Sequence, residues 1–185
     1  MSTDTPRNHS APTQVDRPAY TSLWERPGYL VRRLHQIHLG LFADECATFD
    51  ITPIQFALLT VLRNDQVLDQ ISLSTTVGID RTSGADVIKR LQRRGLVERF
   101  ASTQDRRAML VRITREGKNL AMNMQPAMQA AQARLIAPLS DAEKQVFTSL
   151  MQKLIEANNS ASRAPVGPAS AGDDRNQDFN AGIKP

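Results

Sequence analysis

The side chains in this sequence that are best suited to chemistry are basic, and they gather in one stretch from Arg81 to Arg115. This stretch holds ten Lys or Arg residues and three Asp or Glu residues, a local charge of +7 in a chain whose net charge is +4. The charges of the remaining residues therefore sum to −3, so the positive charge is concentrated in this stretch. Lys and Arg neutralise phosphates, and Arg can also bind guanine through two hydrogen bonds. Such a concentrated charge is typical of a protein that binds nucleic acid.

The pattern within this stretch predicts a helix over 81–94 and then a β-hairpin with strands at 96–100 and 109–113. Asp80 is a favourable N-cap, and Gly95 stands where a helix C-cap requires left-handed backbone. At 100° per residue, the apolar side chains fall on one side of the helix and the polar ones on the other. The nucleic-acid contacts expected from this helix are Arg81, Thr82, Ser83, Asp86, Lys89, Arg90 and Arg93.

The polar residues of this helix differ in the roles that their chemistry allows. Thr82 and Ser83 open the helix, where short hydroxyl groups can approach phosphates or base edges. Asp86 has two alternatives: its carboxylate accepts a hydrogen bond from a cytosine amino group, or it orients Lys89 or Arg90. A basic helix face on its own is more often merely solvated, but the hairpin that follows favours DNA binding.

A polar loop joins the two expected strands of the hairpin. Arg106 or Arg107 at its tip can enter a minor groove, whose negative potential attracts arginine. Asp105 is expected to be structural, pairing with Arg99 or with an arginine of the loop to set the turn.

One set of residues in the helix and hairpin has a distinctive spacing: Leu91, Gly95, Leu96, Val97, Arg99, Asp105, Arg106, Arg107, Ile113, Thr114 and Gly117. With these residues, the helix and the hairpin resemble the recognition helix and wing of the MarR (multiple antibiotic resistance regulator) family of winged helix-turn-helix repressors. Ile113 stands where the family usually has Leu. The resemblance extends with fewer matches from about Leu30 to about Ala157. It implies a homodimer that presents two recognition helices to a palindromic operator in double-stranded DNA.

The elements that must position this region are predicted to be mainly α-helical, with the small β-hairpin as a wing. Capping boxes at Thr52 and Ser140 mark two helix starts, and Pro126 is expected to kink a long helix. The winged-helix domain is expected over 21–159, between tails at 1–20 and 160–185 whose polar composition predicts disorder. Its expected parts are a DNA-reading head at about 52–113 and dimerisation helices at about 23–49, 114–137 and 140–158.

Catalysis finds little support in the sequence. His9 lies in a tail, His35 and His38 share a helix, and no metal-type spacing or phosphate-binding loop occurs. We therefore expect no catalytic residues, no metal and no cofactor. The start of the chain has no apolar core, and no run approaches the ~20 apolar residues of a membrane helix, so a cytoplasmic protein without membrane attachment is expected.

A small-molecule effector is a further implication of the resemblance, because family members bind anionic aromatic ligands beside the first helix. Such a ligand requires a cation or donor next to apolar walls. His38 falls within an apolar stripe, although a satisfied, half-buried histidine is the alternative there. The segment 26–36 is similar to regulators of aromatic-acid or nicotinate breakdown, so a repressor released by a small aromatic carboxylate is expected. The candidate effector residues are Arg26, Tyr29, Arg33, His35 and His38.

Two other functions stay open. One is an architectural DNA-binding protein without an effector. The other is a redox-sensing repressor that uses Cys46, the single cysteine. A sensing thiol requires a lowered pKa and access to solvent. Asp44 and Glu45 beside Cys46 would raise its pKa instead, which favours a quiet, buried cysteine.

Overall fold

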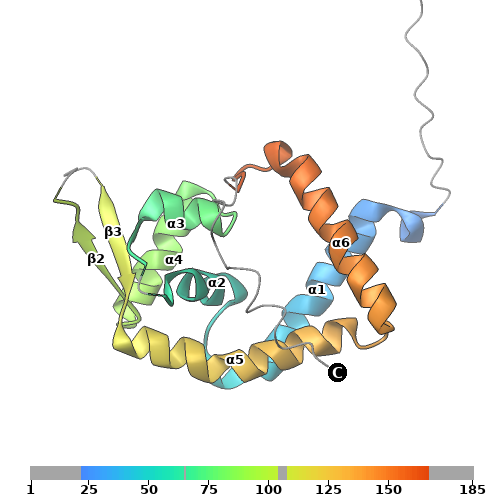
Figure 1. The fold of residues 1–185 in the computed structure, drawn as a ribbon, viewed down its shortest axis with the longest axis horizontal. Helices are drawn as coiled ribbons and strands as arrows, with labels where there is room; N and C mark the ends of the chain where they lie inside the picture. The colour runs from blue at the N-terminus through green and yellow to red at the C-terminus, as the bar shows by residue number, and fades with distance from the viewer. Residues whose placement is uncertain (1–21, 65, 104–107, 167–185) are drawn as a thin grey trace, which may run out of the picture. The chain divides into compact units, whose positions relative to one another are not determined.

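Six α-helices and a three-stranded antiparallel sheet make up the part of the chain that the computed structural model describes, residues 22–64, 66–103 and 108–166 (Figure 1). The expected fold class, mainly α with a small wing, is confirmed. The chain divides into two units, residues 1–35 and residues 36–185. The tail expected at 1–20 lies outside the described residues. Within these residues, no helix is long and apolar enough to cross a membrane.

The first expected helix, over 23–49, consists of three pieces in the structure. A 3₁₀ turn, η1, covers Leu23–Glu25, the helix α1 covers Pro27–Glu45, and a second 3₁₀ turn, η2, covers Ala47–Phe49. Pro27 occupies the first position of α1, where its missing N–H costs no hydrogen bond. Asp50 then takes left-handed backbone, with φ 50°, and turns the chain toward the next helix.

The reading head follows as α2 (Pro53–Leu62), α3 (Gln70–Thr76), α4 (Arg81–Arg93) and the sheet. The capping box at Thr52 is present: the Gln55 amide donates to Thr52 Oγ1 at 3.3 Å, and the Thr52 amide donates to Gln55 Oε1 at 2.9 Å. Such reciprocal bonds satisfy two amides that a helix start leaves without partners.

The wing contains one strand more than the sequence predicted. The hairpin strands are β2 (Val97–Ala101) and β3 (Met109–Ile113), with Arg99 opposite Val111. A third strand, β1 (Leu68–Asp69), pairs with the other edge of β3, which gives the order β1-β3-β2. Two residues are too few to show the alternation by which a strand is recognised.

Two glycines allow backbones to approach closely where side chains could not. A Cβ at Gly84 of α4 would collide with the side chain of Ser74 on α3. A Cβ at Gly117 would collide with the Leu96 carbonyl oxygen, where the next helix, α5, leaves the wing. Gly84 therefore sets the packing of the two helices of the helix-turn-helix, and Gly117 sets the position of the wing against α5, the helix Arg115–Ile136.

The hydrophobic core lies beneath the reading head. Leu58 and Leu62 of α2, Leu73 of α3, Ile88 of α4 and Val111 of β3 are fully buried. Other helices join the same cluster: α5, through its buried face, and the last turn of α1. The recognition helix is thus held on a packed base rather than on a loop.

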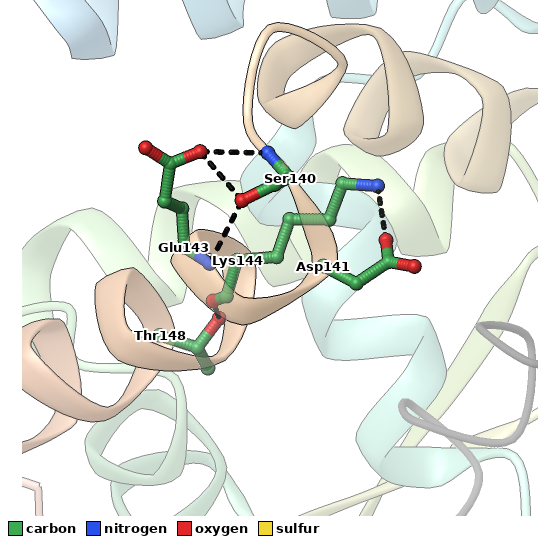
Figure 2. A network of polar contacts seen from close by, with 5 residues as sticks. All are labelled: Ser140, Asp141, Glu143, Lys144 and Thr148. Atoms are coloured by element: carbon green, nitrogen blue, oxygen red, sulfur yellow. Dashed lines mark hydrogen bonds and ion pairs between the residues drawn. The ribbon is translucent and has the colours of Figure 1, made fainter.

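The last two helices are α5 (Arg115–Ile136) and α6 (Asp141–Asn158). The helix α5 continues through Pro126, and the kink expected there stays a prediction. The second predicted capping box begins α6: the Ser140 amide donates to Glu143 Oε2 at 2.8 Å, as Figure 2 shows. Lys144 Nζ adds a hydrogen bond to Asp141 Oδ1 at 2.9 Å in the same network (Figure 2). Although its N-terminus is well capped, α6 has no buried residue.

Residues 159–166, at the start of the expected C-terminal tail, form a defined segment in the structure. A 3₁₀ turn, η3 (Asn159–Ala161), follows α6, and a hydrogen-bonded loop continues to Val166. Residues 167–185 lie outside the described part of the chain. The sequence suggested a tail because the loop is rich in small and polar residues, but side-chain hydrogen bonds define its path.

Candidate nucleic-acid interface

The helix α4 has one face in the core and the opposite face in solvent. Gly84, Ile88 and Leu91 are buried on the inner face, as the periodicity predicted. All seven side chains predicted to contact nucleic acid from this helix are exposed: Arg81, Thr82, Ser83, Asp86, Lys89, Arg90 and Arg93. The structure therefore brings these residues together on one open helix.

The N-terminus of α4 is capped by Asp80. Its Oδ1 accepts hydrogen bonds from the amides of Thr82 and Ser83, each at 3.0 Å. The Ser83 side chain, then the Ser83 and Thr82 amides, hold the pKa of Asp80 below its usual range, so this carboxylate stays ionised. Since Asp80 already uses these amides, contacts to a phosphate at this helix end fall to side chains such as those of Arg81 and Thr82.

The structure favours one of the two alternatives for Asp86, the one in which its carboxylate orients Lys89. Asp86 Oδ1 lies 4.0 Å from Lys89 Nζ, one turn further along the helix. Such an exposed pair contributes only ~0–1 kcal/mol to stability, so its effect is mainly to orient Lys89. A contact from Asp86 to a cytosine stays a prediction.

Two hollows on the described surface of the reading head flank this helix. One, of about 510 Å³, is lined by five α4 residues: Asp86, Lys89, Arg90, Gln92 and Arg93. The other, of about 710 Å³, lies between the end of α4, the wing strands and the start of α5. The smaller hollow is lined by four of the predicted contacts, and the larger one by none of them.

The wing arginines have different surroundings. Arg112 Nε and Nη2 each lie 2.7 Å from Glu98 Oε2 on the opposite strand, and the guanidinium stacks 5.3 Å from the Phe100 ring centre. Arg112 therefore stabilises the hairpin. Arg99 Nη1 donates to Gln92 Oε1 at 3.4 Å and so connects the wing to α4. Its predicted partner Asp105 lies outside the described residues, as do Arg106 and Arg107, and their roles stay predictions.

Arg94 has a role that the sequence analysis missed. Its Nη1 donates to the Asp50 carbonyl oxygen, and its Nη2 donates to the Phe49 carbonyl oxygen at 3.2 Å. It therefore joins the C-cap of α4 to the junction between α1 and α2. Because 44 residues separate Arg94 from Asp50, no local sequence signal marks the contact. Part of the basic charge of this stretch thus contacts the backbone of the protein itself.

The candidate effector residues are carried by α1 and the residue before it. Tyr29 belongs to a small cluster: its ring meets Trp24 edge to face at 5.2 Å, and Arg32 lies 5.6 Å from the ring centre. Arg26, Arg33 and His35 are exposed. His38 is half-buried, with its ring 6.5 Å from that of Phe42. Neither hollow described above is lined by α1, so the effector roles of these residues stay predictions.

Cys46 has the environment of an unreactive thiol. It is 2% exposed, and burial, together with the charge of Glu45, raises the pKa of its thiol. A redox-sensing cysteine requires a lowered thiol pKa and access to solvent, and Cys46 has neither. The described residues also contain no group of three or more His, Cys, Asp or Glu side chains that could hold a metal ion.

The sequence matches a known protein family and a characterised repressor. The MarR family profile matches residues 51–109, from the start of α2 into β3. The repressor NicR of Pseudomonas putida, an HTH-type transcriptional repressor, is 28% identical over 137 residues, which cover 74% of this chain and 87% of NicR.

Two solved structures share most of the fold. The PcaV transcriptional regulator of Streptomyces coelicolor, solved in complex with its natural ligand, is 34% identical with a TM-score of 0.67 and covers 74% of this chain and 96% of PcaV. BpsR of Bordetella bronchiseptica, whose DNA binding is regulated by 6-hydroxynicotinic acid, is 28% identical with a TM-score of 0.69. That match covers 72% of this chain and 95% of BpsR.

Proposed function

Because the chain belongs to the MarR family of DNA-binding transcriptional regulators, which are not enzymes, we propose that it is a homodimeric repressor that a small aromatic carboxylate releases from its operator. The exposed face of α4 carries this proposal. It presents four cations, Arg81, Lys89, Arg90 and Arg93, together with the hydroxyls of Thr82 and Ser83, on a helix whose opposite face is packed in the core. Such a helix fits the major groove, where side chains at its N-terminal end meet base edges.

Dimerisation is supported by the apolar surface of α6. Val146, Leu150, Leu154 and Ile155 are each more than half exposed, although they repeat at the spacing of one helix face. A contiguous apolar face of this kind is typical of a protein interface. A second copy of the chain, related by a two-fold axis, would cover it and place two recognition helices against successive turns of DNA.

An aromatic carboxylate is supported by two relatives and by the chemistry of α1. BpsR responds to 6-hydroxynicotinic acid, an aromatic acid, and PcaV was solved with its natural ligand. In this chain, α1 carries Arg33 and His38, groups that can donate to a carboxylate, on a helix that also carries large apolar residues. Arginine holds a carboxylate through two charge-assisted hydrogen bonds, and apolar walls cover an aromatic ring.

Release follows from coupling between the effector and the recognition helices. The ligand must bind more tightly to an arrangement in which the two helices no longer match their half-sites, about 34–36 Å apart. Arg94 offers a path for this coupling, since it joins the α1–α2 junction to the end of α4. A shift of α1 would thus move the recognition helix with it.

The test is selection of bound duplexes from random DNA, followed by titration of aromatic acids into the preformed complex. Each acid is paired with its primary amide, which keeps the ring and removes the charge. We expect a palindromic site to be selected, and an acid to release it where its amide does not. Selection of a palindrome that no acid releases would favour the architectural alternative, and absence of selective DNA binding would overturn the proposal.

A further inference from the structure

The segment after α6, residues 159–166, is held in a closed loop by one asparagine side chain. Asn159 Nδ2 donates to the Val166 carbonyl oxygen at 2.6 Å, and the Val166 amide donates to Asn159 Oδ1 at 2.9 Å. The Asn159 amide group thus pairs with the Val166 backbone as two strands pair with each other. Two further bonds fix the path between them: Ser162 N to the Asn159 carbonyl at 3.1 Å, and Ala164 N to Ser162 Oγ at 3.1 Å.

The far end of this loop, at Val166, lies beside the turn of the helix-turn-helix. Gly78 has no Cβ, and Val166 Cγ2 lies 3.4 Å from the point where one would stand, so the Val166 side chain, itself 39% exposed, lies next to the Gly78 backbone. Gly78 has φ 72°, a left-handed conformation suited to glycine, and closes α3 before the cap of α4. The Gly78 amide donates to the Thr75 carbonyl at 3.0 Å, and the Ile79 amide donates to the Ser74 carbonyl at 3.1 Å.

We propose that residues 159–166 are a strap that ties the end of α6 to the turn before the recognition helix, and that Asn159 and Val166 are positioning residues for DNA binding. The strap restrains the turn from which α4 starts, only two residues before Asp80. A restrained recognition helix loses less conformational freedom on binding, so the strap raises affinity for the operator without contacting DNA. This inference rests on the proposed role of α4 in reading DNA.

The chain offers a matched control in the neighbouring asparagine. Asn158 Nδ2 donates to the Leu154 carbonyl at 2.8 Å, one turn back in α6, and makes no bond to the strap. Asn158→Ala and Asn159→Ala therefore remove the same side chain from adjacent positions, and only the second releases Val166. Val166→Ser tests the apolar contact while Asn159 remains, and a chain ending at Val166 tests whether residues 167–185 contribute.

The first measurement is hydrogen exchange of the Gly78 and Ile79 amides in the full-length protein without DNA. We expect Asn159→Ala to speed their exchange about three- to tenfold, the factor that corresponds to one neutral hydrogen bond. Val166→Ser should act in the same direction, while Asn158→Ala should leave both rates within about twofold. Unchanged exchange in Asn159→Ala, or an equal change in Asn158→Ala, would overturn the strap.

The second measurement is affinity for the selected operator duplex. Asn159→Ala should weaken it by about three- to tenfold, with the dimer intact in sedimentation, and the chain ending at Val166 should bind like wild type. Faster exchange with unchanged affinity would overturn the positioning role and leave the loop a structural feature. Wild-type protein that selects no duplex would overturn the proposed function instead, while the exchange measurement still decides whether the strap exists.

Discussion

Arg94 at the end of the recognition helix binds Asp50 through both the main chain and the side chain of that residue. The guanidinium donates to the Asp50 carbonyl oxygen, and Nη1 lies 3.6 Å from the carboxylate. The carboxylate is 98% exposed and contributes little, so the carbonyl bonds carry most of the effect. They fix the left-handed turn at Asp50 against α4.

Arg94 and its neighbour Arg93 should therefore respond differently to removal. Arg94→Ala is expected to lower the free energy of unfolding by ~1–2 kcal/mol, because two carbonyl oxygens in a partly exposed turn lose a charged donor. Arg93→Ala is expected to leave stability within ~0.5 kcal/mol and to reduce the salt dependence of DNA binding, because Arg93 is exposed on the face of α4 that we propose binds DNA. Urea unfolding and salt-dependent binding of both variants check this, and equal loss of stability in the two would contradict it.

The close approach of α3 to α4 predicts a large effect from one methyl group. Gly84→Ala places a Cβ against Ser74 and should cost ~1–3 kcal/mol of stability through overpacking. Gly40→Ala in α1 is the matched control, since no atom lies within 4 Å of its added Cβ. That substitution should hold or raise stability by ~0.5–1 kcal/mol, because alanine favours a helix. Thermal unfolding of the two variants in parallel is the measurement. A loss of stability in Gly84→Ala alone supports the close packing of α3 and α4, and an equal change in both variants would contradict it.

The recognition helix and the wing should divide the work of binding. Arg90→Ala or Thr82→Ala is expected to relax discrimination at particular base pairs, worth ~1–3 kcal/mol each where the contact is bidentate. Arg107→Ala, in the wing loop, is expected to weaken binding to many sequences alike. The measurement is affinity for a panel of single-base variants of the selected site. A uniform loss from all three substitutions would refute this division.

The effector prediction separates DNA binding from DNA release. His38→Ala and Arg33→Ala should keep operator affinity but require about ten- to hundredfold more acid for release, because a charged hydrogen bond in a pocket contributes ~1.5–3 kcal/mol. Arg32→Ala is the control, since its guanidinium already contacts the Tyr29 ring. If both test variants release DNA at the wild-type acid concentration, the pocket lies elsewhere and His38 is a core histidine.

Local signals in the sequence predicted most of the elements. The caps at Thr52, Asp80 and Ser140 and the left-handed Gly95 are visible in short stretches, and the structure contains each of them. The periodicity of α4 likewise predicted which of its residues are buried. These features depend on a few neighbouring residues, which is why a single sequence reveals them.

The features that the sequence did not predict depend on distant partners. The contact of Arg94 with Asp50 spans 44 residues, and the side chain of Val166 lies next to Gly78, which is 88 residues earlier in the chain. Strand β1 depends on its pairing with the free edge of β3, which is distant in sequence. Arg94 entered the sequence-based prediction only through the net charge of the stretch 81–115, and only the folded chain shows that it contacts protein carbonyls.

Salt dependence of operator binding tests the central claim, that this chain reads DNA through a basic helix and wing. If the dimer neutralises ~6–10 phosphates, its affinity for the selected duplex should fall by ~10³–10⁵ between about 50 and 200 mM salt. Arg93→Ala should reduce the slope of the logarithmic plot by about one for each phosphate contact that is lost. An affinity that does not change with salt would contradict the account.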